Sequence, residues 1–470
     1  MRQPVRKIGR RYCIPSPLPL TDREFSNLMS AMGPFEARPT IAVGVSGGPD
    51  SLCLALLLKA WAREVGGAVI GLIVDHRLRP ESAFEASKVR AWLTNYGVES
   101  RTLVWGNEPL KSGQQARART ARYNLLIDWC RTAHVLHLAL GHHRDDQAET
   151  LLMRRERSSG EYGLAAMPAI REQGSVRLIR PFLGVSASRL RATLRGLDQE
   201  WVCDPSNYDP KYTRSRIRKS LLSEPTDLRT RKLSQSARMC AKTRNVTEQK
   251  VSKLLVKSTQ IHSEGYAVVD IGQVLSQPQE LVFRALSSII WSLGGHLYAP
   301  RQASVARLVD KLKRQRVLPG YTLGGCFLRS LRDKLFVCRE PIAARASLDI
   351  RTGAKVLWDS RFLVELKGEP TGKPMEYKVR ALSKDGWQIL RNHISSKKAA
   401  GFGIPFFAAY ALPSLWSLDG LVSVPHLDYV DHGNNDSRAM SFHADYRPSR
   451  PLAGALFQGI GCHVASKTIK

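Results

Sequence analysis

The most specific chemical pattern in the chain is a short turn rich in glycine and hydroxyl groups. The sequence Ser-Gly-Gly-Pro-Asp-Ser at positions 46–51 follows the apolar run Ile41–Val45 and precedes a helix expected over Asp50–Ala62. Two glycines let a backbone bend closely around an anion, and a helix start offers free N–H groups at the positive end of its dipole. The turn is therefore predicted to bind phosphate or pyrophosphate, with Asp50 as a candidate ligand for Mg²⁺.

This turn differs from a Walker loop because no Gly-Lys-Ser or Gly-Lys-Thr ends it. A Walker lysine grips the β- and γ-phosphates during transfer of the terminal phosphoryl group. A turn without that lysine fits cleavage between the α- and β-phosphates, in which pyrophosphate leaves and AMP moves to an acceptor. The alternative interpretation is a plain helix cap, in which Ser46 or Asp50 only caps the helix and the glycines only turn the chain.

A second polar segment, Gly141–Thr150, follows the apolar run Val135–Leu140. Its Asp146 and Glu149 are three residues apart, so both carboxylates lie on one face of a helix, where they favour a cation. That cation could be the ε-ammonium group of an amino acid or a metal ion. The metal alternative would use His142, His143, Asp145 and Asp146. The spacing of these four residues fits no standard zinc pattern.

A carboxylate and an imidazole, Asp75 and His76, follow another apolar run, Ala68–Val74. The carboxyl end of this expected strand lies beside the phosphate-binding turn, so both side chains are candidates for the site. Ser82 and Glu85 also fit a capping box for the next helix. A structural role and a functional role for His76 therefore both remain open.

Arginines recur at helical spacing. Arg119 and Arg122 are three residues apart, and Arg214 and Arg218 are one turn apart, with Arg216 between them. Guanidinium groups on one face suit the phosphate oxygens of a nucleotide or of a nucleic-acid backbone. The alternative is a solvated basic surface without a ligand.

The elements that position these residues follow an alternating pattern. From Thr40 to about Leu140, apolar runs alternate with helical patterns, which predicts an α/β fold with a parallel sheet covered on both faces. Ligands in such sheets bind at the carboxyl ends of the strands. A basic helix is expected over Asp227–Ser258, with further helices and then a strand-rich end. The expected domains are an extension 1–38, a catalytic domain 39–222, a basic helical domain 223–340 and a C-terminal domain 347–470.

The composition favours a nucleic-acid partner. The 470 residues include 71 Lys and Arg against 41 Asp and Glu, a net charge of +30, which attracts polyanions. The eight cysteines form no CxxC pair, which favours reduced thiols in the cytoplasm. No apolar run approaches the roughly 18 residues of a membrane span, and the basic N-terminus lacks the apolar core of a secretory signal.

In chain order, the motifs resemble those of the tRNA(Ile)-lysidine synthetases, a family of PP-loop ATP pyrophosphatases. The matching segments are SGGPDS at 46–51, DHRLRPES at 75–82, ARTARY at 118–123, GHHRDDQAET at 141–150, IRPFL at 179–183, DPSN at 204–207 and RSRIR at 214–218. Ser158 stands where the family usually has glycine. The resemblance covers about Ile41 to Arg218 and is looser in the C-terminal region.

The resemblance implies a reaction. ATP would adenylate the C2 carbonyl of the wobble cytidine in tRNA(Ile) with a CAU anticodon. The ε-amine of free L-lysine would then form lysidine, which changes codon reading from AUG to AUA and identity from Met to Ile. The implied ATP-binding residues are Ser46, Gly47, Gly48, Pro49, Asp50, Ser51, Arg119 and Arg122. The implied catalytic or lysine-binding residues are Asp75, His76, His143, Asp145, Asp146 and Glu149. The implied tRNA or phosphate contacts are Arg214, Arg216 and Arg218.

Further expectations concern partners and rival functions. The cofactors would be ATP and Mg²⁺, with basic helices after Asp227 binding tRNA, and the family also allows a homodimer. One rival is a tRNA thiolase of the same superfamily, many of which carry the CxxC pair that this chain lacks. A metabolic synthetase would not need the +30 charge. A basic RNA-binding protein with an inactive nucleotide fold is the rival outside enzymes.

Overall fold

The computed structural model describes the chain in segments that form two compact units. The described residues are 17–75, 82–105, 114–202, 213–222, 227–315, 317–344, 347–368, 376–393, 403–431 and 440–460. Unit 1 comprises Met1–Val246 and Ala455–Lys470, and unit 2 comprises Thr247–Gly454. The domain boundaries expected from the sequence stay predictions.

Unit 1 is built on a six-stranded sheet with the order β3-β2-β1-β4-β6-β5. Its strands are β1 (Thr40–Val45), β2 (Ala68–Asp75), β3 (Glu99–Val104), β4 (His137–Ala139), β5 (Ile170–Gln173) and β6 (Val176–Ile179). All pairs are parallel except β5 with β6, which form an antiparallel hairpin at the edge. The parallel α/β fold expected from the alternating pattern is confirmed.

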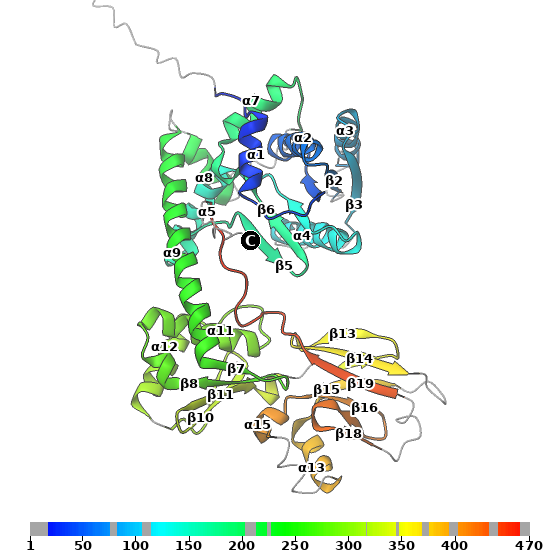
Figure 1. Ribbon diagram of the computed structural model, residues 1–470, viewed down its shortest axis with the longest axis vertical. Coiled ribbons are helices and arrows are strands. Elements are labelled where there is room, and N and C mark those ends of the chain that lie inside the picture. The colour runs from blue at the N-terminus through cyan, green and yellow to red at the C-terminus, as the bar shows by residue number, and fades with distance from the viewer. Residues whose placement is uncertain are drawn as a thin grey trace, which may run out of the picture. The chain divides into compact units, whose positions relative to one another are not determined.

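Helices cover both faces of this sheet (Figure 1). The helices of unit 1 are α1 (Asp22–Ser30), α2 (Pro49–Glu64), α3 (Ser82–Asn95), α4 (Gln114–Thr132), α5 (Arg144–Glu156), α6 (Glu161–Leu164), α7 (Ala187–Gly196) and α8 (Thr213–Leu222), with a 3-10 helix at Pro181–Gly184. Along β1, Ile41 and Val43 pack into the core with α2, α3 and α7, whereas Ala42 packs with α4 on the other face. This alternation follows from the two-residue period of a strand.

Two expected strands differ in length from those observed. The strand expected near Leu103 and Val104 begins earlier, at Glu99. Its first residues are mostly polar, because this edge strand is largely exposed, so they form no apolar run in the sequence. The strand expected from Val135 begins only at His137, since the Val135 N–H donates to the Cys130 carbonyl at the end of α4.

The long helix α9 (Leu228–Ser258) matches the basic helix expected from the sequence and contributes residues to both units. Most of its basic side chains are exposed, namely Arg231, Lys232, Arg238, Lys242, Lys250, Lys253 and Lys257. Arg244 is different, because its guanidinium packs over the rings of Tyr162 and Phe457 at 5.0 and 4.1 Å from their centroids.

The C-terminal segment 455–460 returns to unit 1. The Gln458 carbonyl accepts a hydrogen bond from the Ala169 N–H at 2.7 Å, so the segment lies beside β5. On its other side, the Asn245 amide donates to the Phe457 carbonyl at 2.8 Å. Phe457 itself packs with Ala165 and Ala241. The end of the described chain is thus part of the unit that carries the phosphate-binding turn.

The described residues of unit 2 form three antiparallel sheets with helices. The first sheet contains β7 (Thr259–Ile261), β8 (Tyr266–Asp270), β9 (Tyr321–Leu323), β10 (Cys326–Leu331) and β11 (Lys334–Arg339), and packs with α10 (Ile271–Leu275), α11 (Gln279–Leu293) and α12 (Gln302–Arg314). The second contains β12 (Leu348–Ile350), β15 (Tyr377–Ala381), β16 (Pro413–Trp416), β17 (Leu421–Val424) and β18 (Tyr429–Val430). The third contains β13 (Lys355–Trp358), β14 (Phe362–Gly368) and β19 (Met440–Tyr446). Short helices α13 (Ser383–His393) and α15 (Phe406–Ala409) complete it, and the strand-rich end expected from the sequence is confirmed.

Among the described residues, no helix combines the length and apolar character needed to cross a membrane. Ser158 has a φ of 52°, so the chain keeps a left-handed conformation here with serine at the position where glycine is usual in the resembled family.

Candidate active site at the carboxyl edge of the sheet

The turn at 46–51, which the sequence predicts to bind phosphate, joins β1 directly to α2, as expected. Gly47 has a φ of 79°, a conformation that favours glycine, and Gly48 is the N-cap residue of α2. A Cβ atom on Gly47 would lie 2.6 Å from Cγ2 of Val89 on α3. The Ser51 hydroxyl donates to the Gly48 carbonyl and accepts from the Ser46 N–H, both at 3.1 Å. These bonds lie within the turn itself, and among the described residues no side chain caps the start of α2.

The turn between β4 and α5 lies against the same helix start. Gly141 packs so closely on α2 that a Cβ atom there would lie 3.0 Å from the carbonyl carbon of Asp50. Two residues on, the His143 N–H donates to Oδ2 of Asp146 at 3.0 Å, which caps α5. Because Gly141 and this cap fix the path of the chain, His143 is directed toward Asp50.

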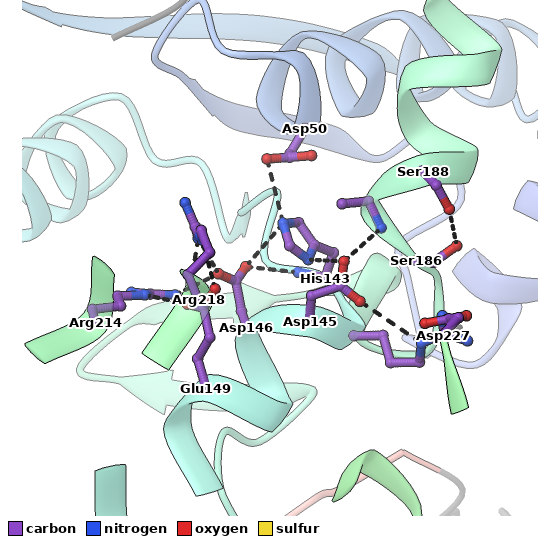
Figure 2. A network of polar contacts seen from close by, with 12 residues as sticks. Asp50, His143, Asp145, Asp146, Glu149, Ser186, Ser188, Arg214, Arg218 and Asp227 are labelled. Carbon is purple, nitrogen blue, oxygen red and sulfur yellow. Dashed lines mark hydrogen bonds and ion pairs between the residues drawn. The ribbon is translucent and has the colours of Figure 1, made fainter. Parts of the chain in front are cut away.

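His143 connects the two turns through its imidazole (Figure 2). Its Nε2 lies 3.4 Å from Oδ2 of Asp50 and 3.6 Å from Oδ2 of Asp146. Burial alone would lower the pKa of His143, but the carboxylates of Asp146, Asp50 and Asp145 raise it to about 9. The imidazole is therefore a cation at neutral pH and acts as a positive link between carboxylates.

The carboxylates of Asp146 and Glu149 lie on one face of α5, as the spacing predicted, but two arginines from α8 meet them there (Figure 2). The Arg214 Nε donates to Oε2 of Glu149 at 2.6 Å, and its Nη2 donates to Oδ1 of Asp146. The Arg218 Nε donates to Oε1 of Glu149, also at 2.6 Å. The arginines expected to contact phosphate thus neutralise the carboxylates expected to bind lysine.

Asp146, Glu149, Arg214 and Arg218 form one cluster of ion pairs, in which burial and charge shift the pKa values in opposite directions. Burial alone would raise the pKa of Asp146, but His143 and Arg214 hold it well below its usual range. Burial alone would likewise lower the pKa of Arg214 and of Arg218, and their carboxylate partners raise both. Asp146, Arg214 and Arg218 are therefore charged at neutral pH.

Asp145 points to the other side of α5, toward the start of α7. Its Oδ2 accepts a hydrogen bond from the Ala187 N–H at 3.2 Å, and its Oδ1 is buried with no hydrogen-bond partner among the described residues. Burial raises the pKa of Asp145, and His143, whose Nδ1 lies 4.0 Å away, lowers it only in part. Next to it, Arg144 pairs with Asp227 just before α9.

The other residues singled out from the sequence lie elsewhere or outside the description. Asp75 is buried at the end of β2, where it accepts a hydrogen bond from the Ser82 hydroxyl at 2.9 Å. Arg122 is half-buried on α4, and Arg216 is exposed and faces away from the carboxylates. His76 and the side chain of Arg119 lie outside the described residues.

Two residues that support α5 were not identified from the sequence. The side-chain amide of Gln147 exchanges two hydrogen bonds of 2.8 Å with the backbone of Met167. Arg154 donates to the Ala166 carbonyl at 2.9 Å and to that of Gly163. The sequence offered one signal for this supporting role, which is Gln147 within the DDQAET segment. A side-chain amide that becomes buried needs hydrogen-bond partners, and the backbone can supply them.

The geometry also tests the metal interpretations. Within the described residues, no group of three or more His, Cys, Asp or Glu side chains is arranged to hold a metal ion, so the alternative at His142, His143, Asp145 and Asp146 gains no support. Asp50 alone fits Mg²⁺, because its Oδ1 is buried and has no hydrogen-bond partner among these residues. One carboxylate together with substrate phosphates is an ordinary set of ligands for Mg²⁺.

Comparisons with known proteins found one family model and several relatives that match much of the chain. A family model described as a PP-loop domain matches residues 19–225. The tRNA(Ile)-lysidine synthase of Ruegeria pomeroyi is 35% identical over 401 residues, covering 83% of this chain and 90% of that protein. That of Orientia tsutsugamushi is 29% identical over 414 residues, covering 86% and 93%. Among solved structures, the U34-tRNA thiolase NcsA of Methanococcus maripaludis aligns with a TM-score of 0.40 and 18% identity over 46% of this chain and 79% of that one.

Proposed function

The chain belongs to the tRNA(Ile)-lysidine synthase family, and we propose that it converts the wobble cytidine of tRNA(Ile) with a CAU anticodon to lysidine. The enzyme is a ligase that forms a C–N bond and cleaves ATP to AMP and pyrophosphate. The observation that carries the proposal is the continuous set of contacts from Asp50 through His143 to Asp146. These contacts join the phosphate-binding turn to the paired carboxylates of α5.

In the first step, the turn at 46–51 would hold the phosphates of ATP. The C2 carbonyl oxygen of the cytidine attacks the α-phosphorus, the bond from that phosphorus to the bridging oxygen breaks, and pyrophosphate leaves. The open start of α2 and the left-handed Gly47 support phosphate binding there. Asp50 would hold Mg²⁺ through Oδ1, which has no hydrogen-bond partner within the described part of the chain, and this ion would offset charge on the triphosphate.

In the second step, the ε-amine of lysine attacks C2, and the bond from C2 to the adenylated oxygen breaks and releases AMP. Asp146 and Glu149 would bind the ε-ammonium group, because they are buried carboxylates on one face of α5. Two carboxylates favour such a cation once their arginine partners have moved.

The ammonium must lose a proton before it can attack, and Asp145 is the best candidate to accept it. Because its carboxylate points away from Asp146 and Glu149, the proton would reach it through an intervening water. His143 is already protonated at neutral pH because its pKa is raised to about 9. Asp146 has a pKa well below the usual range, so it is a weak base. Asp145 instead has a raised pKa and a buried oxygen without a hydrogen-bond partner among the described residues.

The basic surface would bind the tRNA. The net charge of +30 and the exposed lysines and arginines of α9 suit the phosphate backbone, whereas bases in the anticodon loop would supply specificity. Free lysine, ATP and tRNA as substrates agree with a cytoplasmic enzyme. A homodimer, allowed by the resemblance, can be tested by light scattering with and without tRNA.

A direct test is to incubate the protein with ATP, labelled L-lysine and a transcript of tRNA(Ile) carrying the CAU anticodon. Nucleoside analysis should find labelled lysidine at the wobble position, with one AMP released per lysine incorporated. A tRNA(Met) transcript serves as the control and should stay unlabelled. A thiolated nucleoside formed with a sulfur donor would support the thiolase instead, and tRNA binding without pyrophosphate release would support a non-catalytic RNA-binding protein.

A further inference from the structure

We infer that Arg214 and Arg218 form a displaceable cover on the lysine-binding carboxylates, and that the phosphates of ATP draw this cover away so that lysine can bind. The inference rests on the proposed function, because it takes Asp146 and Glu149 as the ammonium-binding pair. It adds an order to the reaction, in which nucleotide binding precedes lysine binding.

The first support is an asymmetry of exposure across the ion pairs. The side chains of Glu149 and Asp146 are only 2% and 9% exposed, whereas those of Arg214 and Arg218 are 34% and 33% exposed. The carboxylates are the buried side of each ion pair, and the guanidinium groups are the side nearer to solvent. Only the arginines can therefore leave by rotation of long, partly solvated side chains.

The second support is charge. Two carboxylates face two guanidinium groups, so the cluster has no negative charge left for an ammonium group. A lysine ε-ammonium added to this arrangement would meet two cations at close range. Lysine binding therefore requires at least one arginine to move, and a guanidinium that leaves a buried carboxylate needs another anion.

The third support is the direction in which such an anion lies. The two oxygens of Asp146 face opposite partners, since Oδ1 accepts from Arg214 and Oδ2 faces His143. His143 in turn touches Asp50 at the start of α2 (Figure 2). One carboxylate and one imidazole thus separate Arg214 from the phosphate-binding turn. Phosphate oxygens accept paired hydrogen bonds from guanidinium groups at least as well as carboxylates do.

The helices themselves can stay in place during this exchange. The backbone of α5 is held by the hydrogen bonds between Gln147 and Met167. The apolar side of α8 packs against α5 through Ile217 and Leu221. These contacts lie apart from the guanidinium groups, so the exchange needs only new side-chain rotamers of Arg214 and Arg218.

The consequence is positive coupling between two substrates. A ligand shifts a two-state equilibrium only through its different affinity for the two states, and phosphate prefers the state in which the arginines have left. Because coupling is reciprocal, lysine should also strengthen nucleotide binding. The arginines would then lie on the phosphates, where negative charge develops as pyrophosphate leaves.

The test is calorimetric titration of L-lysine into the full-length protein, alone and with α,β-methylene-ATP and Mg²⁺. In the wild-type protein, lysine should bind about 5- to 150-fold more tightly with the nucleotide analogue than without it. L-Norleucine, which lacks the ε-ammonium group, should not gain affinity. Equal lysine affinity in both conditions, or no lysine binding in either, would overturn the inference.

The arginines are tested by Arg214→Gln, Arg218→Gln and the double variant. Lysine should bind these variants without nucleotide, and the ratio between the two conditions should fall toward one. Lys219→Gln is the matched control, because it removes one exposed positive charge from the same helix and should keep the wild-type ratio. A double variant that keeps the wild-type ratio would refute the role of the arginines. If a variant fails to fold, the wild-type titration still decides.

The outcomes separate this inference from the proposed function. If the protein makes lysidine while nucleotide leaves lysine affinity unchanged, the synthase function stands and the exchange is wrong. If tRNA alone, without nucleotide, gives the increase in lysine affinity, the displacing anion is not ATP and the inference is also wrong. If no lysidine forms, the proposed function fails and the exchange fails with it.

Discussion

Nε2 of His143 lies 3.4 Å from Oδ2 of Asp50, so an ion pair joins the turn after β4 to the turn after β1. These turns are 93 residues apart in sequence (143 − 50 = 93) and meet at the carboxyl edge of the sheet. The pair makes the turn at 46–51 and the carboxylates of α5 one electrostatic unit. Several measurable consequences depend on this unit.

The contribution of His143 to stability should depend on pH. Its pKa is raised from an unfolded value of about 6.5 to about 9 in the folded protein, so the protonated form is favoured by folding. The contribution, on the order of 3 kcal/mol, is fully present below pH ~6.5 and is lost as the pH rises through about 9. Urea unfolding of the wild type and of His143→Gln should therefore differ most near pH 6 and least near pH 10. A difference that is independent of pH would contradict this assignment.

Replacing Asp145 with asparagine should separate the two chemical steps. Removal of a general base slows the step that the base assists by about 10²- to 10⁴-fold. Asp145→Asn should therefore slow lysidine formation by that amount. Adenylation, measured as tRNA-dependent ATP–pyrophosphate exchange, should stay near the wild-type rate. The Asn side-chain oxygen can still accept the hydrogen bond from the Ala187 N–H, so the start of α7 should be preserved.

A useful control for that experiment is Asp227→Asn. It also removes a carboxylate near α5, where Asp227 pairs with Arg144, but it keeps the Asp145 carboxylate in place. The pKa of Asp145 should fall somewhat in this variant, because the charge of Asp227 helps to raise it. Both steps should proceed in this variant. Equal loss of the two steps in Asp145→Asn would indicate damage to the site as a whole and would rule out Asp145 as the base.

The two glycines of the phosphate-binding turn should differ in their tolerance of a methyl group. Gly47→Ala should destabilise the protein by about 1–2 kcal/mol from its left-handed backbone alone, with a further cost from the 2.6 Å contact with Val89. Gly48→Ala should change stability by no more than about 0.5 kcal/mol, because its φ of −70° is ordinary and the nearest atom lies 3.5 Å away. Urea unfolding compares the two variants directly, and equal stabilities would contradict the geometry of the turn.

The C-terminal segment should stabilise the unit that holds the site. Phe457 is buried against Ala165 and Ala241, so Phe457→Ala should cost about 3 kcal/mol. Hydrogen exchange should accelerate in β5, because the Gln458 carbonyl bonds to the Ala169 N–H beside that strand. Leu456→Ala, at a half-buried neighbour, is the control and should have a smaller effect. Unchanged exchange in β5 would argue against this role.

Much of unit 1 could be predicted from the sequence because its signals are local. A buried strand, two glycines and a helix start are contiguous in the chain, so the turn at 46–51 could be recognised without knowing any distant contact. The shared face of Asp146 and Glu149 follows from helical spacing alone. The exposed edge strand β3 was recognised only in part, since its sequence has little apolar periodicity.

The order of amino acids dictates which residue types are present and the order in which strands and helices bring them to one edge of the sheet. Which charges meet there depends on how the helices pack. Arg214 and Glu149 are 65 residues apart, and the pairing between them depends on how α8 packs on α5. Likewise, Phe457 reaches Asn245 across 212 residues because its segment returns beside β5. Local spacing fixes the face of a helix on which a residue lies. The partner of a buried charge depends on how distant elements pack, because a buried carboxylate without a partner costs too much free energy.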